Sequence, residues 1–208
     1  SIDVALVGRP NAGKSSLYNA ITGGDAKVGN FPGITVDVLE ASAPLPGGGR
    51  ANFFDLPGVY SVADGVDPDS DEGQARACIE RLEKREGAFA VAQVVDATQL
   101  VLGLRQTREI LARGWPTIVL VTQRDVLEKS GARIDAELLA RELGVPVLAV
   151  SARDKDVRAR VLAAAAAFAD QNLPHAEPRT FEPRQLAERA VKRPKLRPRN
   201  ESTARADA

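Results

Sequence analysis

The sequence predicts an α/β domain with a mostly parallel six-stranded sheet, one antiparallel strand and helices on both faces. From residue 88 onward, apolar runs typical of buried strands alternate with amphipathic segments of helical period. Near the start of the chain, a glycine-rich turn separates a short apolar run from a helical segment. Because parallel strands need crossover connections, this alternation indicates a sheet covered by helices.

The N-terminal part contains three predicted strands. Residues 2–7 form the first, and the first helix follows at residues 15–21. Residues 36–43 and 51–54 are β-like, and the turn between them, residues 44–49, ends in glycines that tolerate the positive φ angles of a hairpin. We expect these two strands to pair antiparallel.

The rest of the chain supplies the remaining strands and most of the helices. The expected strands are residues 88–95, 117–121 and 145–150, and the expected helices are residues 100–112, 134–143, 157–168 and 184–192. Five prolines interrupt the chain after the alanine-rich helix, at Pro174, Pro178, Pro183, Pro194 and Pro198. We therefore place a boundary near Leu173, with residues 1–173 as one domain and residues 174–208 as a reduced helical segment and linker.

The composition excludes several classes of function. The 28 basic residues balance 28 acidic ones, which argues against electrostatic binding of nucleic acid. A single cysteine, Cys78, and a single histidine, His175, exclude a disulfide framework and a His/Cys metal cluster. No apolar run approaches the roughly 18 residues that cross a bilayer, and no signal peptide precedes the first strand. The chain lacks methionine, so we expect a processed or excised piece of a longer protein.

The strongest motif is Gly8-Arg-Pro-Asn-Ala-Gly-Lys-Ser15, which satisfies G-x-x-x-x-G-K-[ST] between a strand and a helix. The glycines let backbone N–H groups converge on phosphates, and the helix N-terminus adds partial positive charge. We expect Lys14 to reach the β- and γ-phosphates and Ser15 to ligate Mg²⁺. A glycine-rich turn without a ligand is the alternative.

Two further segments fit a phosphate site. Asp55-Leu-Pro-Gly58 follows a predicted strand and places a carboxylate near Mg²⁺, through water, and a glycine N–H near the γ-phosphate. Without the phosphate loop it would be an ordinary strand-ending turn, since Asp, Pro and Gly all favour turns. Gly29-Asn-Phe-Pro-Gly-Ile-Thr35 has the position of a switch loop, in which Thr35 offers a hydroxyl and a carbonyl to Mg²⁺ and the γ-phosphate.

Together these segments resemble the Era-like branch of translation-factor-related GTPases. Two segments are similar to the cytoplasmic G domain of the bacterial ferrous-iron transporter family FeoB. They are Val28-Gly-Asn-Phe-Pro-Gly-Ile-Thr-Val36 and Asp55-Leu-Pro-Gly-Val-Tyr-Ser61. The resemblance covers about the first 155 residues. It implies a P-loop GTPase fold, GTP or GDP as ligand, and a GTP-hydrolysing switch that regulates or drives iron uptake.

The resemblance also assigns the base site. Thr122-Gln-Arg-Asp125 occupies the position of the N-K-x-D motif, and Asp125 keeps the carboxylate that accepts from guanine N1 and N2. Ser151-Ala152-Arg153 matches the S-A loop, whose N–H meets guanine O6, although a plain strand-to-helix loop remains the alternative. Because Thr122 and Gln123 replace Asn and Lys, we expect roughly tenfold weaker binding with a retained GTP preference.

The complete set of nucleotide-binding residues that the resemblance implies is Asn11, Ala12, Gly13, Lys14, Ser15, Ser16, Gly33, Ile34, Thr35, Asp55, Gly58, Thr122, Gln123, Asp125, Ser151, Ala152 and Arg153. The catalytic residues among them are Lys14, Thr35, Asn11 and Gly58. The Mg²⁺ ligands are Ser15, Thr35 and, through water, Asp55, and Asn11 holds K⁺.

The residue after the second phosphate motif leads us to expect a role for potassium in hydrolysis. Val59 stands where Ras-like proteins carry the glutamine that orients the attacking water. Relatives with an apolar residue here use a potassium ion held partly by a P-loop asparagine, which Asn11 matches. We therefore expect slow basal turnover that potassium stimulates more than sodium does. The alternative for Asn11 is a side chain that only bonds its own loop.

The implied partner is a C-terminal transmembrane iron-permeation domain of the same polypeptide, with no nucleic acid. The resemblance therefore implies a soluble fragment at the cytoplasmic side of the bacterial inner membrane. It leaves open whether the full-length protein forms a homo-oligomer. In the family a helical domain follows the G domain, whereas only about 35 residues follow Leu173.

Two other functions stay open. A soluble Era-like GTPase of ribosome or tRNA maturation is the first, but the tail lacks an aromatic stacking set for nucleic acid. The second is a nucleotide-binding regulatory module that barely hydrolyses, which the altered base motif favours.

Overall fold

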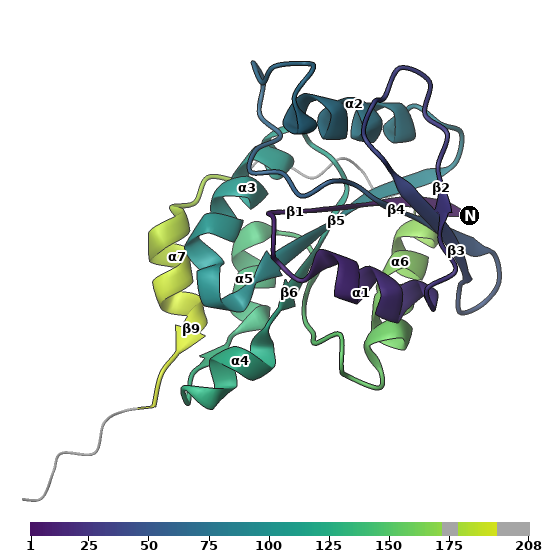
Figure 1. Cartoon of the computed structure of the whole chain (residues 1–208). Helices are drawn as coiled ribbons and strands as arrows, with labels where there is room; N and C mark the ends of the chain where they lie inside the picture. The colour runs from purple at the N-terminus through teal and green to yellow at the C-terminus, as the bar shows by residue number, and fades with distance from the viewer. Residues whose placement is uncertain (172–178, 195–208) are drawn as a thin grey trace, which may run out of the picture.

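A seven-stranded sheet runs through the centre of the molecule (Figure 1). The structure is a computed structural model that describes residues 1–171 and 179–194. The strand order is β2-β3-β4-β1-β5-β6-β8. The strands are β1 (Ile2–Gly8), β2 (Lys27–Val28), β3 (Leu39–Pro44), β4 (Arg50–Asp55), β5 (Ala88–Asp96), β6 (Thr117–Thr122) and β8 (Val147–Ala149).

The sheet confirms the predicted fold class and adds one strand to it. β4, β1, β5, β6 and β8 run parallel to one another, and β3 pairs antiparallel with β4 as predicted, and also with β2. The sheet has seven strands instead of six because β2 extends its edge, where Lys27 pairs with Glu40 and Val28 with Leu39. Two exposed residues carry no hydrophobic period, so the sequence does not reveal such a strand.

Helices cover both faces of this sheet (Figure 1). They are α1 (Lys14–Thr22), α2 (Asp71–Glu83), α3 (Leu100–Ala112), α4 (Arg124–Lys129), α5 (Ala136–Leu143), α6 (Val157–Gln171) and α7 (Pro183–Ala190), with a short 3-10 turn η1 (Ala97–Gln99) before α3.

Strand β1 shows how the sheet divides the core, because its side chains alternate between the two faces. Ile2, Val4 and Leu6 belong to an apolar cluster that includes α1 and α6. Ala5 and Val7 belong to a cluster on the opposite face, which includes α2. Both faces are therefore buried, which explains the continuous apolar runs of the parallel strands.

Helix α2 is absent from the predicted elements. Its buried residues include Ala75, Cys78, Ile79 and Leu82, but its exposed face is strongly charged and no long apolar run marks it. The Ser70 side chain caps its start by accepting the Gly73 N–H over 3.1 Å. Burial raises the pKa of the Cys78 thiol to about 12, so this thiol stays protonated and unreactive, in line with a purely structural residue.

A small second sheet changes two expected helix boundaries. Strand β7 (Arg133–Ile134) pairs antiparallel with β9 (Val191–Lys192). The helix expected over residues 134–143 therefore begins at Ala136, and the helix expected over 184–192 ends at Ala190. The Asp135 N–H donates to Ala190 O over 2.8 Å and closes the corner between the two elements.

Helix α7 packs on the domain that the phosphate loop belongs to. Leu186, Ala187 and Ala190 share one apolar cluster with Leu104 of α3 and Leu139 of α5. The expected boundary near Leu173 and the single histidine, His175, lie outside the described residues. Within the described ranges, none of the helices combines the length and apolarity that a membrane crossing requires.

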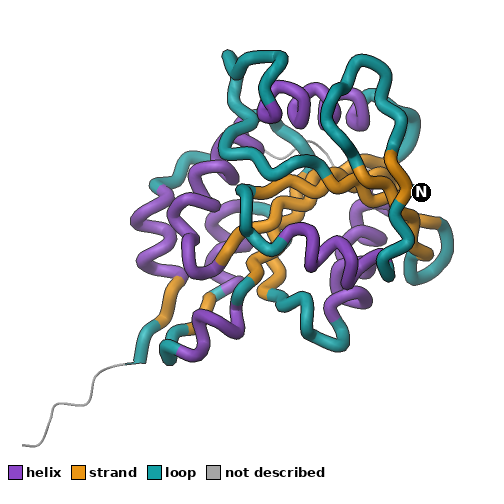
Figure 2. Tube along the Cα trace, viewed as in Figure 1, coloured by secondary structure: helices purple, strands orange, loops and turns teal. Residues whose placement is uncertain are grey.

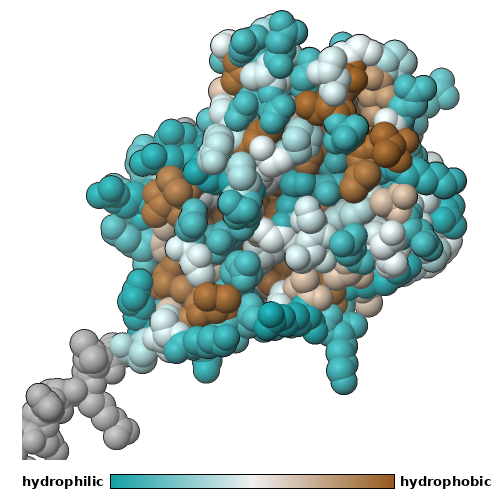
Figure 3. Space-filling view, viewed as in Figure 1, coloured by the Kyte–Doolittle hydropathy of each residue, from teal (hydrophilic) through white to brown (hydrophobic). Residues whose placement is uncertain are grey.

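The exposed surface is mostly hydrophilic on the face shown in Figure 3, where hydrophobic side chains form separate small patches. Large hydrophobic side chains that are exposed include Val28, Tyr60 and Val126, which lie on three different elements or loops. This face therefore offers no single broad apolar area for docking.

Replacement of Gly73 by alanine is expected to destabilise the fold by about 2 kcal/mol, because a Cβ there would collide with the Asp67 carbonyl oxygen and lie 2.7 Å from Pro68 Cα. Backbone atoms cannot rotate aside, so the start of α2 would have to shift. Thermal unfolding should show a midpoint several degrees lower. The exposed neighbour variant Asp71→Ala serves as the control, and equal midpoints for the two variants would contradict the close contact.

Candidate functional site

The phosphate loop joins the end of β1 to the start of α1 at the carboxyl edge of the parallel strands (Figure 2). Asn11 and Gly13 have left-handed backbones, with φ angles of 64° and 84°. Left-handed residues between right-handed ones turn successive N–H groups toward one side and form an anion-binding nest. The N-terminus of α1 adds its partial positive charge to this nest.

A cavity of about 420 Å³ opens above the nest. Its lining residues come from the loop, the start of α1 and the turn after β4, and they are Arg9, Pro10, Asn11, Gly13, Lys14, Ser15, Ser16 and Gly58. A cavity of this size with mixed polar walls suits a small anionic ligand.

Lys14 and Asp55 form an ion pair beside this cavity, and their side chains are only 9% and 8% exposed. Asp55 ends β4, directly beside β1 in the sheet. The lysine supplies a cation for phosphate oxygens, while the Asp55 carboxylate and the exposed Ser15 hydroxyl are the hard oxygen ligands that Mg²⁺ prefers. The donor set therefore fits a Mg²⁺-bound phosphate ester.

The turn after Asp55 is fastened to the phosphate loop. The Val59 N–H donates to Gly8 O over 3.0 Å. A Cβ on Gly58 would lie 3.0 Å from Pro10 Cα, so only glycine permits this close approach without a shift. The Gly58 backbone is thereby held at the cavity wall.

A buried polar network, which the motifs do not indicate, supports the same turn. Gln106 of α3 donates from Nε2 to Val59 O over 2.7 Å, and Gln93 of β5 donates to Gly103 O over 3.0 Å. The Thr107 hydroxyl donates to Gln93 Oε1 over 2.7 Å, and all three polar side chains are buried. In the sequence, this network is indicated by Gln93, a glutamine inside the otherwise apolar run of β5.

The proposed switch loop lies against α2 instead of the cavity. The Thr35 N–H donates to Gln74 Oε1 over 2.8 Å, and Thr35 is exposed. Gly33 and Ile34 precede it in the same loop, and none of these three residues lines the cavity. The structure therefore does not bring the 33–35 segment together with the other predicted site residues.

Aromatic and cationic contacts anchor this loop to the domain. Phe31 is buried and meets Phe54 edge to face, with ring centroids 5.6 Å apart. The Arg85 guanidinium lies over both rings, at 5.1 and 5.3 Å from their centroids. Arg81 of α2 donates to the Pro32 carbonyl. The loop is thus attached to α2 through Gln74 and Arg81, and to the rest of the domain through Phe54 and Arg85.

The base-motif segment follows β6 and contacts the phosphate loop. The Thr122 hydroxyl donates to Ala12 O over 2.6 Å, so the threonine retains a direct link between the two loops through one hydrogen bond. Gln123 has a left-handed φ of 57° and precedes α4. Asp125 stands in the first turn of α4 with its side chain 36% exposed.

The loop after β8 lies beside this segment, because β6 and β8 are parallel neighbours. Its Ser151 N–H donates to Asp154 Oδ2 over 2.9 Å, and its Arg153 N–H donates to Ser151 Oγ over 3.2 Å. Among the described residues, the Ala152 N–H between them has no hydrogen-bond partner. The loop therefore presents one backbone donor next to the helix that carries Asp125.

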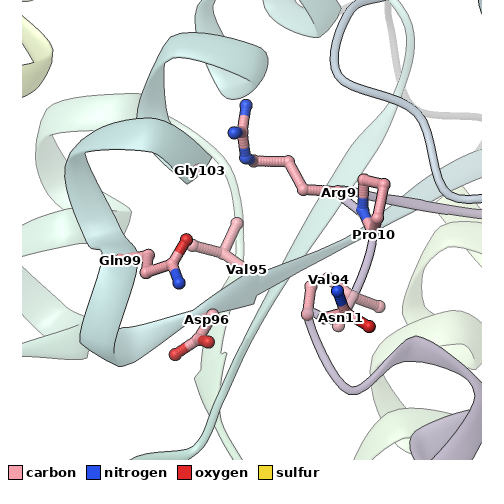
Figure 4. A pocket seen from close by; sticks show the side chains of 9 residues that line it. Arg9, Pro10, Asn11, Val94, Val95, Asp96, Gln99 and Gly103 are labelled. Carbon is pink, nitrogen blue, oxygen red and sulfur yellow. The ribbon is translucent and has the colours of Figure 1, made fainter.

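A second, small cavity of about 20 Å³ lies on the α3 side of the phosphate loop. Figure 4 shows the side chains that line it. Arg9 and Asn11 line it from the loop, and Asp96 and Gln99 line it from the end of β5 and the turn η1. Its volume is sufficient for about one water molecule. The Arg9 guanidinium also lies over the Tyr60 ring, 4.8 Å from its centroid.

A nest at a helix N-terminus, a Lys–Asp pair beneath it and two adjacent loops at the same sheet edge define a domain of the P-loop GTPase class. The family described as "Ferrous iron transport protein B" matches residues 2–165 of this chain. The chain therefore belongs to the ferrous iron transport protein B (FeoB) family, which confirms the family that the switch-loop wording indicated.

Curated relatives carry the same name. The chain is 37% identical over 151 residues to the Fe(2+) transporter FeoB of Leptospira biflexa, covering 73% of this chain and 21% of that protein. It is 35% identical over 157 residues to the Fe(2+) transporter FeoB of Helicobacter pylori, covering 76% of this chain and 23% of that protein. The chain thus spans between a fifth and a quarter of the length of these relatives.

Solved structures of FeoB domains have the same fold. A GDP-bound variant of the S. thermophilus FeoB G domain is 34% identical with a TM-score of 0.71, and the match covers 90% of this chain and 68% of that one. The G domain of T. maritima FeoB is 32% identical with a TM-score of 0.69, over 81% of this chain and 99% of that one. The cytosolic domain of L. pneumophila FeoB is 28% identical with a TM-score of 0.71, over 86% and 72%.

Proposed function

We propose that this chain is the GTP-binding and GTP-hydrolysing switch domain of a ferrous-iron transporter. The Lys14–Asp55 pair at the foot of the phosphate nest carries this proposal, because it places a phosphate cation and a Mg²⁺ carboxylate at one cavity. The domain regulates or drives Fe²⁺ passage through a membrane domain of the same polypeptide, at the cytoplasmic side of the bacterial inner membrane. The names and greater lengths of the curated relatives support this part.

The phosphates and Mg²⁺ bind at the nest. Lys14 balances charge on the β- and γ-phosphates, and Mg²⁺ is held by Ser15 and, through water, by Asp55. Thr35 completes this site only after its N–H leaves Gln74, because the switch loop lies against α2 in the structure. We therefore propose that nucleotide binding draws the loop from α2 toward the cavity.

The guanine base is read by Asp125 and the Ala152 N–H. The carboxylate accepts from guanine N1–H and N2–H₂, and the free N–H donates to O6. Adenine lacks the N1–H and carries an amine where guanine has O6, so it would leave both protein groups unsatisfied. The link from the Thr122 hydroxyl to Ala12 holds this base loop against the phosphate loop.

Hydrolysis is expected to be faster in potassium than in sodium, by roughly tenfold or more. Val59 is fully buried and offers no polar group to a water molecule, whereas Asn11 is exposed on the phosphate loop and can hold an added cation. Phosphate release at saturating GTP and Mg²⁺, in KCl and NaCl of equal ionic strength, measures this effect. It also tests the proposed function itself, since a domain that releases no phosphate in either salt is not a GTPase.

Asn11→Ala should remove the difference between the two salts while leaving slow basal turnover. Asn19→Ala, an exposed asparagine on α1, is the matched control and should behave as the parent does. Equal rates in potassium and sodium for the parent would show that Asn11 only stabilises its own loop.

A further inference from the structure

A single carboxylate joins the two loops that would read the base. Arg124, the first residue of α4, donates from Nη2 to Asp154 Oδ1 over 2.8 Å. The other oxygen of the same side chain, Asp154 Oδ2, accepts the Ser151 N–H over 2.9 Å. Arg124 follows β6 and Ser151 follows β8, so the Asp154 side chain connects the ends of two neighbouring strands.

We propose that Arg124 and Asp154 form a positioning pair that sets the spacing between the two guanine-reading groups, Asp125 and the Ala152 N–H. This inference rests on the proposed function. It assigns a role to Arg124, the third residue of the altered base motif, a position at which the N-K-x-D pattern specifies no residue.

The pair differs from an ordinary surface ion pair, which contributes little. The Asp154 side chain is 17% exposed, and both of its oxygens accept hydrogen bonds. The Arg124 Nε is buried and has no hydrogen-bond partner in the part of the chain that the structure describes. Since Glu128 is 3.9 Å from Arg124 Nη1, the bond to Asp154 is what fixes the guanidinium. Charge-assisted bonds that are partly buried are stronger and better directed.

The pair acts on the neighbours of both reading groups. Asp125 directly follows Arg124 in the first turn of α4, so an anchored Arg124 fixes the position of the next carboxylate. Ala152 directly follows Ser151, whose N–H Asp154 holds. Guanine must meet Asp125 with N1 and N2 and Ala152 with O6 at the same time, which requires one spacing. Loosening the pair should therefore weaken guanine binding and leave the phosphate contacts intact.

The test compares GDP and ADP as competitors of a fluorescent GDP analogue, for the parent, Arg124→Gln, Asp154→Asn and the double variant. Each single substitution should lower GDP affinity about tenfold and leave ADP affinity unchanged, so the ratio of the two affinities falls about tenfold. The double variant should lose clearly less than the sum of the two single losses, because either change alone already removes the bond between Arg124 and Asp154. Glu128→Gln, which removes the other carboxylate near Arg124, should keep the parent's ratio within about twofold.

Thermal unfolding of each variant distinguishes positioning from a merely structural role. A lower unfolding midpoint with an unchanged ratio of GDP to ADP affinity would overturn the inference. So would a double variant whose loss equals the sum of the two single losses, since the residues would then act independently. The affinities of the parent chain test the proposed function separately. If the parent binds GDP no better than ADP, the base-reading assignment fails, whatever the variants show.

Discussion

Replacing Lys14 with alanine is expected to abolish GTP hydrolysis and to weaken binding of Mg²⁺ and a GTP analogue by roughly hundredfold or more. The ammonium group lies at the cavity beneath the phosphate nest, paired with Asp55. Its removal takes a cation from the phosphates and leaves a buried carboxylate without a counter-charge close to an anionic ligand. Titration of a fluorescent GTP analogue in the presence of Mg²⁺ measures the change.

The same substitution threatens the fold, because breaking a buried ion pair costs about 3–5 kcal/mol. Lys14→Arg keeps the positive charge beside Asp55 and is the second variant: it should fold as the parent does and still bind poorly, since a planar guanidinium does not fit a point-charge site. Lys27→Ala, an exposed lysine on β2, is the control for a lost charge. Parent-like affinity of Lys14→Ala would show that the nest is not the phosphate site.

Asp125→Asn is expected to reverse the base preference, with GTP affinity falling roughly hundredfold while XTP affinity rises. In the proposed base site the carboxylate accepts two hydrogen bonds from guanine, whereas an asparagine amide would present a donor that meets the C2 carbonyl of xanthine. Asp125 is 36% exposed and its nearest cation, Arg153, is 3.8 Å away, so the carboxylate is accessible to a base. Competition of a labelled GTP analogue by GTP, ATP and XTP reports both changes.

Asp156→Asn removes an exposed carboxylate from the neighbouring loop and should leave all three affinities unchanged. Two results would contradict the assignment. Equal competition by ATP and GTP in the parent would mean that Asp125 does not read guanine, and an Asp125→Asn variant with the parent's order of affinities would place the reading group elsewhere.

The helices and strands that the sequence predicted are those that follow from patterns within their own residues. Strand β5 and helix α3 have the predicted positions to within one residue, because a buried run and a helical period are local properties. The phosphate loop is equally local, since its glycines and its following helix form the nest. Helix α2 is different: apart from its local Ser70 cap, it carries few apolar residues, and the sheet against which they pack is distant in sequence.

The site shows the same division. Lys14 and Asp55 meet because β1 and β4 pair in the sheet, a contact that the topology of the predicted fold already contains. Thr35 lies away from them because Gln74, 39 residues further along, accepts its N–H. The Arg124–Asp154 contact likewise depends on the exact positions of two side chains on different loops. No period or motif encodes such contacts, so only the structure reveals them.

The pairing of β7 with β9 determines how a mechanical load would enter the domain. β9 directly follows α7, and its partner β7 follows the turn after α4. A pull on the chain at Pro194 would therefore load the β7–β9 pairing and, through the continuous backbone, the end of α7 together. Because β7 and β9 pair at only two residues each, this short ribbon depends on the elements packed beside it for its stability. Tension at Pro194 would reach α4, the helix that carries Asp125, through β7 and the short turn between them.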